Sequence, residues 1–155
     1  MVLQINNLNY FVPLSSPKES DYIVNCGKKE IRKSIIPIIR IVIKDKLGND
    51  ELKGTLKFSN MIPIPNCALL DYDVESEQDE DYKILILKEL SFIFDNTDNI
   101  IKHAKVIHTQ KTKKYNINYL KDTVNFKSLE QKCREYENTE QIIMETAQQI
   151  AAVKD

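Results

Sequence analysis

Residues 2–14 read VLQINNLNYFVPL, and this stretch indicates the class of fold. Two runs of β-prone residues are joined by Asn6–Asn7, and asparagine tolerates the positive φ angles that a tight hairpin turn requires. The sequence therefore predicts a β-hairpin at the start of the chain. Residues 15–18 then read SSPK, where Pro17 disfavours helical backbone at Ser16. We expect a strand that ends in a loop carrying two hydroxyls and an amine.

A second hairpin is predicted further along the chain. Residues 35–44 are rich in β-branched side chains, residues 45–50 form a turn that contains a glycine, and residues 52–58 resume the strand pattern. Between the two hairpins, residues 19–34 are charged, and we expect an irregular or partly helical basic stretch there. Residues 61–65 read MIPIP, whose two prolines exclude a helix or a central strand and predict a rigid extended passage across the core.

From Tyr82 onward the apolar residues follow the period of a helix. The first predicted helix has one wide apolar face, formed by Ile86, Leu87, Leu90, Ile93 and Phe94. After the capping residues 95–98, a second helix buries Ile100, Ile101, Ala104 and Ile107. A third follows Asn125 and buries Phe126, Leu129, Cys133 and Tyr136. Residues 137–155 are predicted to form a peripheral, weakly docked helix with a thin stripe of Ile142, Ile143, Ala147 and Ile150.

Strands precede helices, so the expected class is α+β with an antiparallel sheet rather than a doubly wound α/β fold. The chain has 155 residues, of which 42% are hydrophobic and 29% charged, and it fits one domain spanning residues 1–155. Neither a membrane span nor a signal peptide is evident, and we expect a soluble cytoplasmic protein. The three cysteines include no CxxC pair and are expected to be core thiols.

The net charge of −1 conceals strong segregation. Residues 1–70 carry ten Lys/Arg and six Asp/Glu, whereas residues 71–98 carry two and ten. Residues 99–136 carry nine and three, and residues 137–155 carry one and four. Two basic blocks thus flank an acidic block whose most acidic part, residues 71–81, is predicted to be an exposed loop. Such blocks suit a polyanionic partner on part of the surface, although charge alone favours ordinary solvated faces.

Several common kinds of site are excluded. Gly48 and Gly54 have the wrong spacing for a phosphate-binding P-loop, and Thr55 stands where that motif needs lysine. His103 and His108 are five positions apart and fall on different faces of a helix, so they do not share a metal ion. The carboxylates of residues 71–81 resemble a solvated loop more than a magnesium site. We expect no cofactor and no metal.

The loop at Ser15, Ser16, Pro17 and Lys18 remains as a chemical candidate. Metal-free RNA cleavage needs a donor for the phosphate oxygens, a cation beside the developing charge and a path for the proton. A hydroxyl and an ammonium supply these functions. A lysine of ordinary pKa, about 10.4, is better suited to act as a cation and leaving-group acid than as a base. The alternative is that this tetrapeptide is an ordinary structural turn.

Four blocks of sequence, in order, resemble one known family. They are NYFVPLSSPK (9–18), LKFSNMIPIP (56–65), ILKELSFIFDNTDNIIKHA (86–104) and NFKSLEQKCREY (125–136). These blocks look like the ToxN, AbiQ and CptN endoribonuclease toxins of type III toxin–antitoxin systems. The resemblance implies a twisted antiparallel sheet with a barrel-type core akin to the Kid and MazF toxins, with packed helices.

The resemblance also implies an activity and partners. Members of this family cleave single-stranded A-rich RNA such as mRNA without a metal and leave a 2′,3′-cyclic phosphate. A repeat-derived pseudoknot RNA antitoxin holds the toxin in check, commonly in a ring of three proteins and three RNAs, until phage infection triggers abortive infection. Neither DNA nor a membrane is among the implied partners.

The implied site residues fall on positions that match the family's motifs. Ser16 and Lys18 are the catalytic candidates, together with Ser15. Lys57 and Asn60 resemble groove-lining positions for RNA, although Asn60 could simply satisfy a turn. Helix lysines Lys102 and Lys105 are expected to contact phosphates. The basic stretch adds the remaining RNA-binding candidates: Lys28, Lys29, Arg32 and Lys33.

Two alternatives stay open: an RNA-binding module without catalysis, and a protein-interaction domain of a mobile element. Relatives usually carry a few dozen residues before the first block, whereas Met1 here stands only eight positions ahead of Asn9. We therefore expect weaker cleavage than in full-length relatives.

Overall fold

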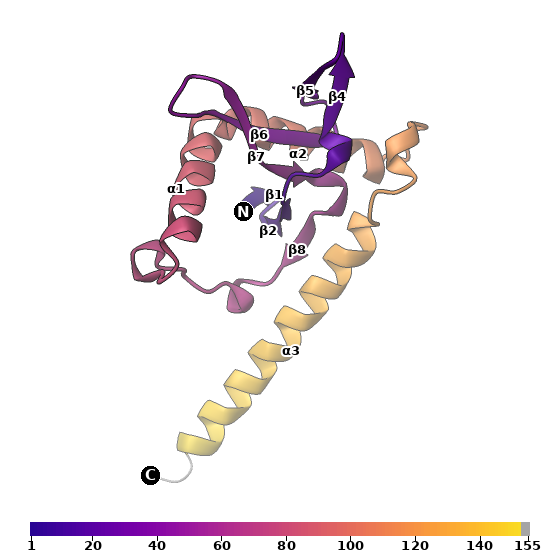
Figure 1. Cartoon of the computed structure of the whole chain (residues 1–155). Coiled ribbons are helices and arrows are strands. Elements are labelled where there is room, and N and C mark those ends of the chain that lie inside the picture. The colour runs from indigo at the N-terminus through magenta and orange to yellow at the C-terminus, as the bar shows by residue number, and fades with distance from the viewer. Residues whose placement is uncertain (153–155) are drawn as a thin grey trace.

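The fold is α+β, as predicted, with strands in the first part of the chain and helices in the second (Figure 1). The computed structural model describes residues 1–152. Its strands form two three-stranded sheets and a separate two-stranded hairpin, all antiparallel. Within these residues the sheets stay open, so the barrel-type core expected from the family resemblance is not confirmed.

The first sheet has the order β1-β2-β8, with bounds Val2–Ile5, Leu8–Phe11 and Ile62–Ile64. The predicted first hairpin is confirmed, because Asn6 and Asn7 adopt φ angles of 50° and 63° in its turn. Pro63 pairs with Tyr10 in the edge strand β8. An edge position tolerates proline, and this accounts for the predicted extended passage.

The second sheet has the order β3-β7-β6, with bounds Leu14–Ser15, Asp50–Lys57 and Ile38–Lys44. The predicted second hairpin is thus confirmed, with Gly48 at a φ of 84° in its turn. Gly54 faces α1, and a Cβ atom there would lie 3.0 Å from Oε1 of Glu89. A side chain at position 54 would therefore require the side chains of Glu89 and Leu14 to shift by a few tenths of an ångström.

The prediction for residues 19–34 is wrong except for a short 3-10 turn at Glu19–Asp21. A third hairpin lies here, with strands β4 (Tyr22–Asn25) and β5 (Lys28–Ile31). Its turn uses Cys26 and Gly27 at φ angles of 48° and 76°. The hairpin projects from the body of the molecule (Figure 1). Neither of its strands has a buried face, so its sequence lacks the alternation of apolar and polar residues that predicts a half-buried strand.

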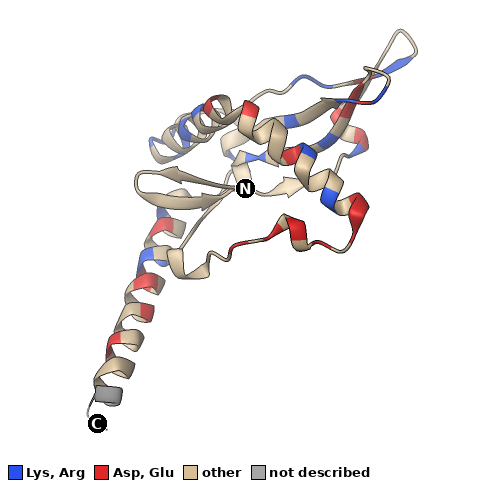
Figure 2. Ribbon diagram, turned by 90° about the vertical axis from the view of Figure 1, so that its left-hand side faces the viewer, with Lys and Arg blue, Asp and Glu red and all other residues tan. Residues whose placement is uncertain are grey.

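Three helices follow, with bounds α1 Glu80–Asp95, α2 Thr97–Thr112 and α3 Phe126–Ala152. The remaining 3-10 turns are Phe58–Asn60, Asn66–Ala68, Val74–Ser76 and Asn118–Leu120. The acidic residues of 71–81 lie along the predicted exposed loop and continue into the start of α1 (Figure 2). In α2, Ile100, Ala104 and Ile107 are fully buried, as predicted, whereas Ile101 is only half-buried.

The predicted apolar face of α1 is only partly buried: Ile86 and Ile93 are half-buried, and Ile93 packs against the core. No residue of this helix is fully buried, and Phe94 is 82% exposed. The helix packs beside β6 and β7, and a cavity of about 910 Å³ separates its apolar side chains from Phe11 and Leu14. The periodicity of the apolar residues therefore predicted the position of the helix correctly, but it did not predict how the helix packs.

Helix α3 replaces the two helices predicted at the C-terminal end. Phe126 and Cys133 are buried against the body, whereas Tyr136 is 53% exposed, contrary to the prediction. The helix then continues away from the body (Figure 1), and its expected stripe at Ile142, Ile143 and Ala147 is exposed. The side chain of Ile150 lies outside the described residues. The second half of α3 therefore does not dock weakly on the body as expected.

The hydrophobic core lies between the first two sheets and α2. Its largest fully buried apolar side chains are Tyr10, Phe58, Phe126, Ile41, Leu56 and Met61. Cys133 is buried but Cys26 and Cys67 are exposed, so the expectation of three core thiols is wrong. Over residues 1–152, none of the helices combines the length and apolar character needed to cross a bilayer.

Candidate functional site

The Ser-Ser-Pro-Lys motif lies where β3 leaves the sheet. Ser15 ends β3 and stands opposite Thr55 of β7. The hydroxyl oxygens of these two residues are 2.7 Å apart, and Thr55 is 1% exposed. Ser16, Pro17 and Lys18 then follow in an exposed loop. One anchored hydroxyl is therefore followed by an exposed hydroxyl and an exposed amine, as the predicted strand end required.

A row of polar side chains crosses the second sheet beneath this loop. Thr55 pairs with Ser15 on one side and with Arg40 of β6 on the other. Residues that pair directly across antiparallel strands project from the same face of a sheet. Ser15, Thr55 and Arg40 consequently share one face, even though they come from three strands.

A buried ion pair continues this row toward Lys18. The Arg40 guanidinium lies 3.0 Å from Oδ1 of Asp21, and the two residues are 7% and 6% exposed. The other carboxylate oxygen of Asp21, Oδ2, accepts a hydrogen bond from the backbone N–H of Lys18 at 3.0 Å. Arg40 also donates to the backbone carbonyl of Lys33 at 2.9 Å. The charge of Arg40 is thus neutralised inside the protein, while the backbone of Lys18 is held.

The side chain of Lys18 remains available to a ligand. Across residues 1–152, no carboxylate lies within 4.0 Å of its amine. Exposure also means that its ammonium keeps a hydration shell that a phosphate oxygen can replace. The loop therefore presents an unpaired cation and a hydroxyl two positions apart.

The predicted basic stretch becomes the projecting hairpin next to this loop. The Lys29 ammonium lies 2.9 Å from Oε1 of Glu19 and 4.3 Å from the centroid of the Tyr22 ring. Arg32 donates from Nε to the Tyr22 carbonyl at 3.1 Å. Lys28 and Lys33 are exposed. These four cations lie close in sequence to Lys18, and Lys29 and Arg32 are already engaged within the protein.

Lys57 and Asn60 lie at the end of β7. The backbone N–H of Lys57 donates to the Pro13 carbonyl at 3.1 Å, beside the strand that leads into the loop. Lys57 is two residues from Thr55, and the period of a strand places it on the same face. Asn60 is exposed and accepts a hydrogen bond from Ser59 within a 3-10 turn. Its contact is local, so the alternative of a turn residue stays open.

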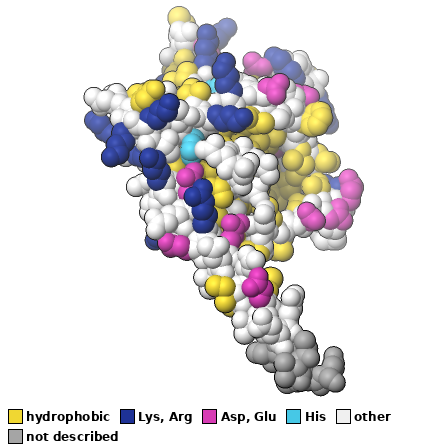
Figure 3. Space-filling view, turned by 180° about the vertical axis from the view of Figure 1, so that it is seen from behind, with side chains coloured by type: hydrophobic (Ala, Val, Ile, Leu, Met, Phe, Trp, Pro, Cys, Tyr) yellow, Lys and Arg dark blue, Asp and Glu magenta, His cyan; other side chains and the backbone are white. Residues whose placement is uncertain are grey.

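Lys102 and Lys105 belong to a different surface. Both are exposed on α2, where they line a shallow hollow of about 460 Å³ together with Ile101 and Val106. Viewed from behind, most basic side chains gather over the upper and left-hand parts of the molecule, whereas acidic ones are prominent at the right (Figure 3). The structure thus places Ser15, Ser16 and Lys18 where β3 ends, Lys57 across from the residue that precedes β3, and the α2 lysines in a separate group.

Three residues of this region were not predicted: Asp21, Arg40 and Thr55. Arg40 did carry a signal, because it interrupts the apolar run of residues 35–43. A buried arginine needs a partner, but the sequence does not indicate which carboxylate supplies it. None of the predicted site residues lines the large cavity beside α1. It is lined by a carboxylate, Glu89, whose pKa is raised by burial.

The fold and the site define a class: an α+β protein that presents a hydroxyl and an ammonium at a strand end, beside basic surfaces suited to a polyanion. The family can then be identified. The family model "Toxin ToxN, type III toxin-antitoxin system" matches residues 1–134. The chain therefore belongs to the ToxN toxin family of type III toxin–antitoxin systems.

Two relatives support this assignment. "Endoribonuclease ToxN" of Bacillus thuringiensis subsp. kurstaki is 27% identical over 146 residues, which cover 89% of this chain and 67% of the relative. "Endoribonuclease AbiQ" of Lactococcus lactis subsp. lactis is 30% identical over 138 residues, covering 88% of this chain and 70% of the relative.

Solved structures share the fold. One, from a type III toxin–antitoxin system with selective toxin inhibition by a non-coding RNA pseudoknot, has a TM-score of 0.65 at 23% identity, covering 87% of this chain and 76% of its own. AbiQ, a lactococcal anti-phage endoribonuclease, has a TM-score of 0.60 at 23% identity, covering 86% of this chain and 74% of its own.

Proposed function

We propose that this chain is an endoribonuclease toxin that cleaves single-stranded RNA at the Ser16–Lys18 loop and is inhibited by an RNA antitoxin. The observation that carries the proposal is the loop itself. An exposed hydroxyl and an unpaired ammonium follow a strand end that is anchored by Ser15 and Thr55. The chain belongs to a toxin family whose relatives are named endoribonucleases. RNA cleavage is therefore the reaction that we assign to this loop.

The chemistry that suits these groups is internal attack by the ribose. The 2′-oxygen of the RNA forms a bond to the adjacent phosphorus, and the bond from phosphorus to the 5′-oxygen breaks. The Ser16 hydroxyl donates to a non-bridging oxygen, and the Lys18 ammonium offsets the charge that develops there. Lys18 then protonates the departing 5′-oxygen, while the proton of the 2′-hydroxyl passes to solvent. The products are a 2′,3′-cyclic phosphate and a 5′-hydroxyl, and no step requires a metal.

The basic surfaces account for RNA affinity. The β4–β5 hairpin follows the loop in the chain, Lys57 lies beside Pro13 at the start of β3, and Lys102 and Lys105 add a second positive surface on α2. Lysine–phosphate contacts of this kind provide affinity that depends on salt but little sequence information. The proposal also includes a preference for A-rich RNA and cleavage of mRNA in the cytoplasm. It further includes assembly with a pseudoknot antitoxin into a ring of three proteins and three RNAs.

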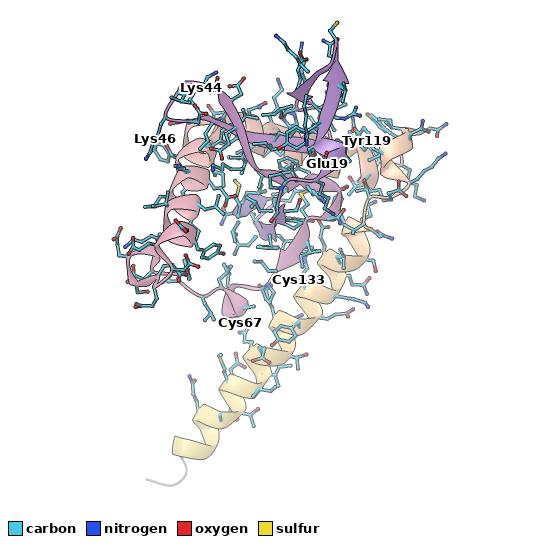
Figure 4. The ribbon with its side chains drawn as sticks, viewed as in Figure 1. Glu19, Lys44, Lys46, Cys67, Tyr119 and Cys133 are labelled. Carbon is cyan, nitrogen blue, oxygen red and sulfur yellow. The ribbon has the colours of Figure 1, made fainter. Side chains whose placement is uncertain are left out.

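Measurement of the rate of RNA cleavage by the Lys18→Ala variant, compared with the wild type, tests this function. The substrate is an end-labelled, A-rich single-stranded RNA in buffer containing EDTA. Loss of one group that stabilises the transition state lowers the rate by about 100-fold or more. Lys46→Ala is the matched control, since it removes the same charge from the exposed β6–β7 turn. Figure 4 shows Lys46 at the left of the sheet and Glu19, which follows Lys18 in the chain, at its right.

The outcomes separate the proposal from its alternatives. We expect cleavage by the wild type and Lys46→Ala, a large loss in Lys18→Ala, and similar affinity of all three for a non-cleavable 2′-O-methyl RNA. Binding without cleavage by the wild type would instead identify an RNA-binding module. Lack of both would favour a protein-interaction domain.

A further inference from the structure

We propose that Asp21 and Arg40 are positioning residues for RNA cleavage, which act by fixing the backbone of Lys18. This inference rests on the endoribonuclease function proposed above. Neither residue is accessible to RNA, because Asp21 is 6% and Arg40 7% exposed. They are therefore expected to influence the reaction only through the loop that they hold.

Asp21 clamps Lys18 by two reciprocal hydrogen bonds. Oδ2 of Asp21 accepts the backbone N–H of Lys18 at 3.0 Å, and the Asp21 backbone N–H donates to the Lys18 carbonyl at 2.8 Å. The two bonds close the short 3-10 turn at Glu19–Asp21. Both backbone groups of Lys18 are thereby fixed, while its side chain is left exposed.

Arg40 holds the clamp on the sheet. Its Nε lies 3.2 Å and an Nη atom 3.0 Å from Oδ1 of Asp21, so Oδ2 remains available to Lys18. Arg40 is itself fixed in β6, and its backbone N–H donates to the Ser34 hydroxyl at 2.8 Å. The backbone of Lys18 is thus fixed relative to strand β6, the edge strand that pairs with β7 in the second sheet.

The same sheet face anchors the other side of the loop. Thr55 pairs with Arg40 and contacts the hydroxyl of Ser15, so Ser16 lies between two anchored points. The clamp also extends to the hairpin, since the Arg32 N–H donates to the Asp21 carbonyl at 2.9 Å. One buried ion pair consequently sets the relation of the Ser16–Lys18 loop to both the sheet and the basic hairpin.

Stability alone does not explain such a pair. Replacing a buried ion pair with well-packed apolar side chains is often neutral or stabilising. What apolar residues do not provide is a carboxylate oxygen for the Lys18 N–H. Displacement of a catalytic group by about 1 Å can cost about 100-fold in rate, so loss of the clamp is expected to slow cleavage by moving Lys18.

Single-turnover cleavage with protein in excess tests the proposal. At saturating protein the rate constant is insensitive to a fraction of unfolded protein, so it reports on geometry, whereas half-saturation reports on binding. In Asp21→Asn one amide oxygen replaces two carboxylate oxygens and does not serve both Arg40 and Lys18. Asp21→Glu keeps the charge but moves the carboxylate by one methylene. Arg40→Lys keeps the positive charge but replaces the forked guanidinium, which holds Asp21 through Nε and an Nη atom, with a single ammonium.

We expect both Asp21 variants to lower the saturating rate constant by about tenfold or more, with half-saturation changed by less than about threefold. Arg40→Lys should lower the saturating rate constant as well, because one ammonium does not reproduce the two-pronged hold on Asp21, and a wild-type rate constant in this variant would remove Arg40 from the proposal. The control Asp50→Asn, whose ion pair with Lys44 is exposed, should stay within about threefold of the wild type. A wild-type rate constant in the Asp21 variant that folds would overturn the positioning role alone. Absence of cleavage by the wild type would overturn the proposed function as well.

Discussion

The Tyr10 hydroxyl donates a hydrogen bond to Oε1 of Glu130 across 2.6 Å, although the two residues are 120 positions apart. The same carboxylate oxygen lies 2.7 Å from Nε2 of His108. Phe126 stacks on the His108 ring with a centroid distance of 5.3 Å. Strand β2 and helices α2 and α3 therefore meet at one partly buried carboxylate, which attaches the first turns of α3 to the body.

Tyr10→Phe should destabilise the protein through this contact. The substitution keeps the ring but removes a partly buried hydrogen bond to a charged group, at a cost of about 1.5–3 kcal/mol. Urea denaturation measures the loss. Tyr72→Phe is the matched control, because the exposed Tyr72 hydroxyl also donates to a carboxylate, that of Glu77, and exposed contacts contribute about 0.5 kcal/mol or less. Equal losses in the two variants would contradict this role of Glu130.

Acid should weaken the same contact. Burial acts to raise the pKa of Glu130, but hydrogen bonds from Tyr10 and His108 outweigh it and hold the pKa below its ordinary value of 4.5. The stabilisation is complete above pH 4.5 and is lost as the pH falls through the folded-state pKa. In urea melts from pH 7 to pH 3, Glu130→Gln should therefore lose less stability than the wild type on acidification. Parallel curves would refute the assignment.

Thr55→Val should impair cleavage more than folding. It leaves the Ser15 hydroxyl, 2.7 Å from Thr55, without its partner beneath the reactive loop, and a lost hydrogen bond of this kind costs about 1 kcal/mol of stability. Thr123→Val is the control, since the buried Thr123 hydroxyl donates to the Tyr119 carbonyl at 2.8 Å, away from the loop. Single-turnover cleavage and urea denaturation compare the two variants. A selective loss of rate in Thr55→Val is expected, and similar rates would refute it.

Removal of Lys102 and Lys105 together should weaken RNA binding in a salt-dependent way. Each phosphate contact contributes about 0.7 to the slope of log affinity against log salt for single strands, so the slope should fall by about 1.4. Fluorescence anisotropy with a 2′-O-methyl RNA measures it. The control Lys44→Ala with Lys46→Ala removes two lysines from the β6–β7 turn and should leave the slope unchanged. An unaltered slope in the α2 variant would exclude these lysines from the interface.

Local chemistry made part of this fold predictable. The Asn6–Asn7 turn, the glycine turn at Gly48 and the helical periods are properties of short segments, and all three are found in the structure. The β4–β5 hairpin was missed because it projects into solvent and lacks a buried face. The exposed face of α1 was missed because periodicity reports amphipathicity, whereas burial depends on what packs against the helix.

The candidate site likewise has a part that local sequence predicted and a part that it did not. Pro17 predicted the end of the strand and so placed Ser16 and Lys18 in a loop. The Asp21–Arg40 and Ser15–Thr55 contacts join residues 19 and 40 positions apart, and they arise only from the pairing of β3, β6 and β7. Contacts that depend on strand assembly leave little local signal, so these supporting residues required the structure.

The most direct test of the central claim is the chemistry of the cut ends. Wild-type protein is incubated in EDTA with a defined A-rich single-stranded RNA, and the fragments are analysed by mass spectrometry. Attack by the 2′-oxygen with Ser16 and Lys18 predicts a 2′,3′-cyclic phosphate on one fragment and a 5′-hydroxyl on the other, and both should disappear in Lys18→Ala. Fragments ending in a 3′-hydroxyl and a 5′-phosphate, or undiminished cleavage by Lys18→Ala, would contradict it.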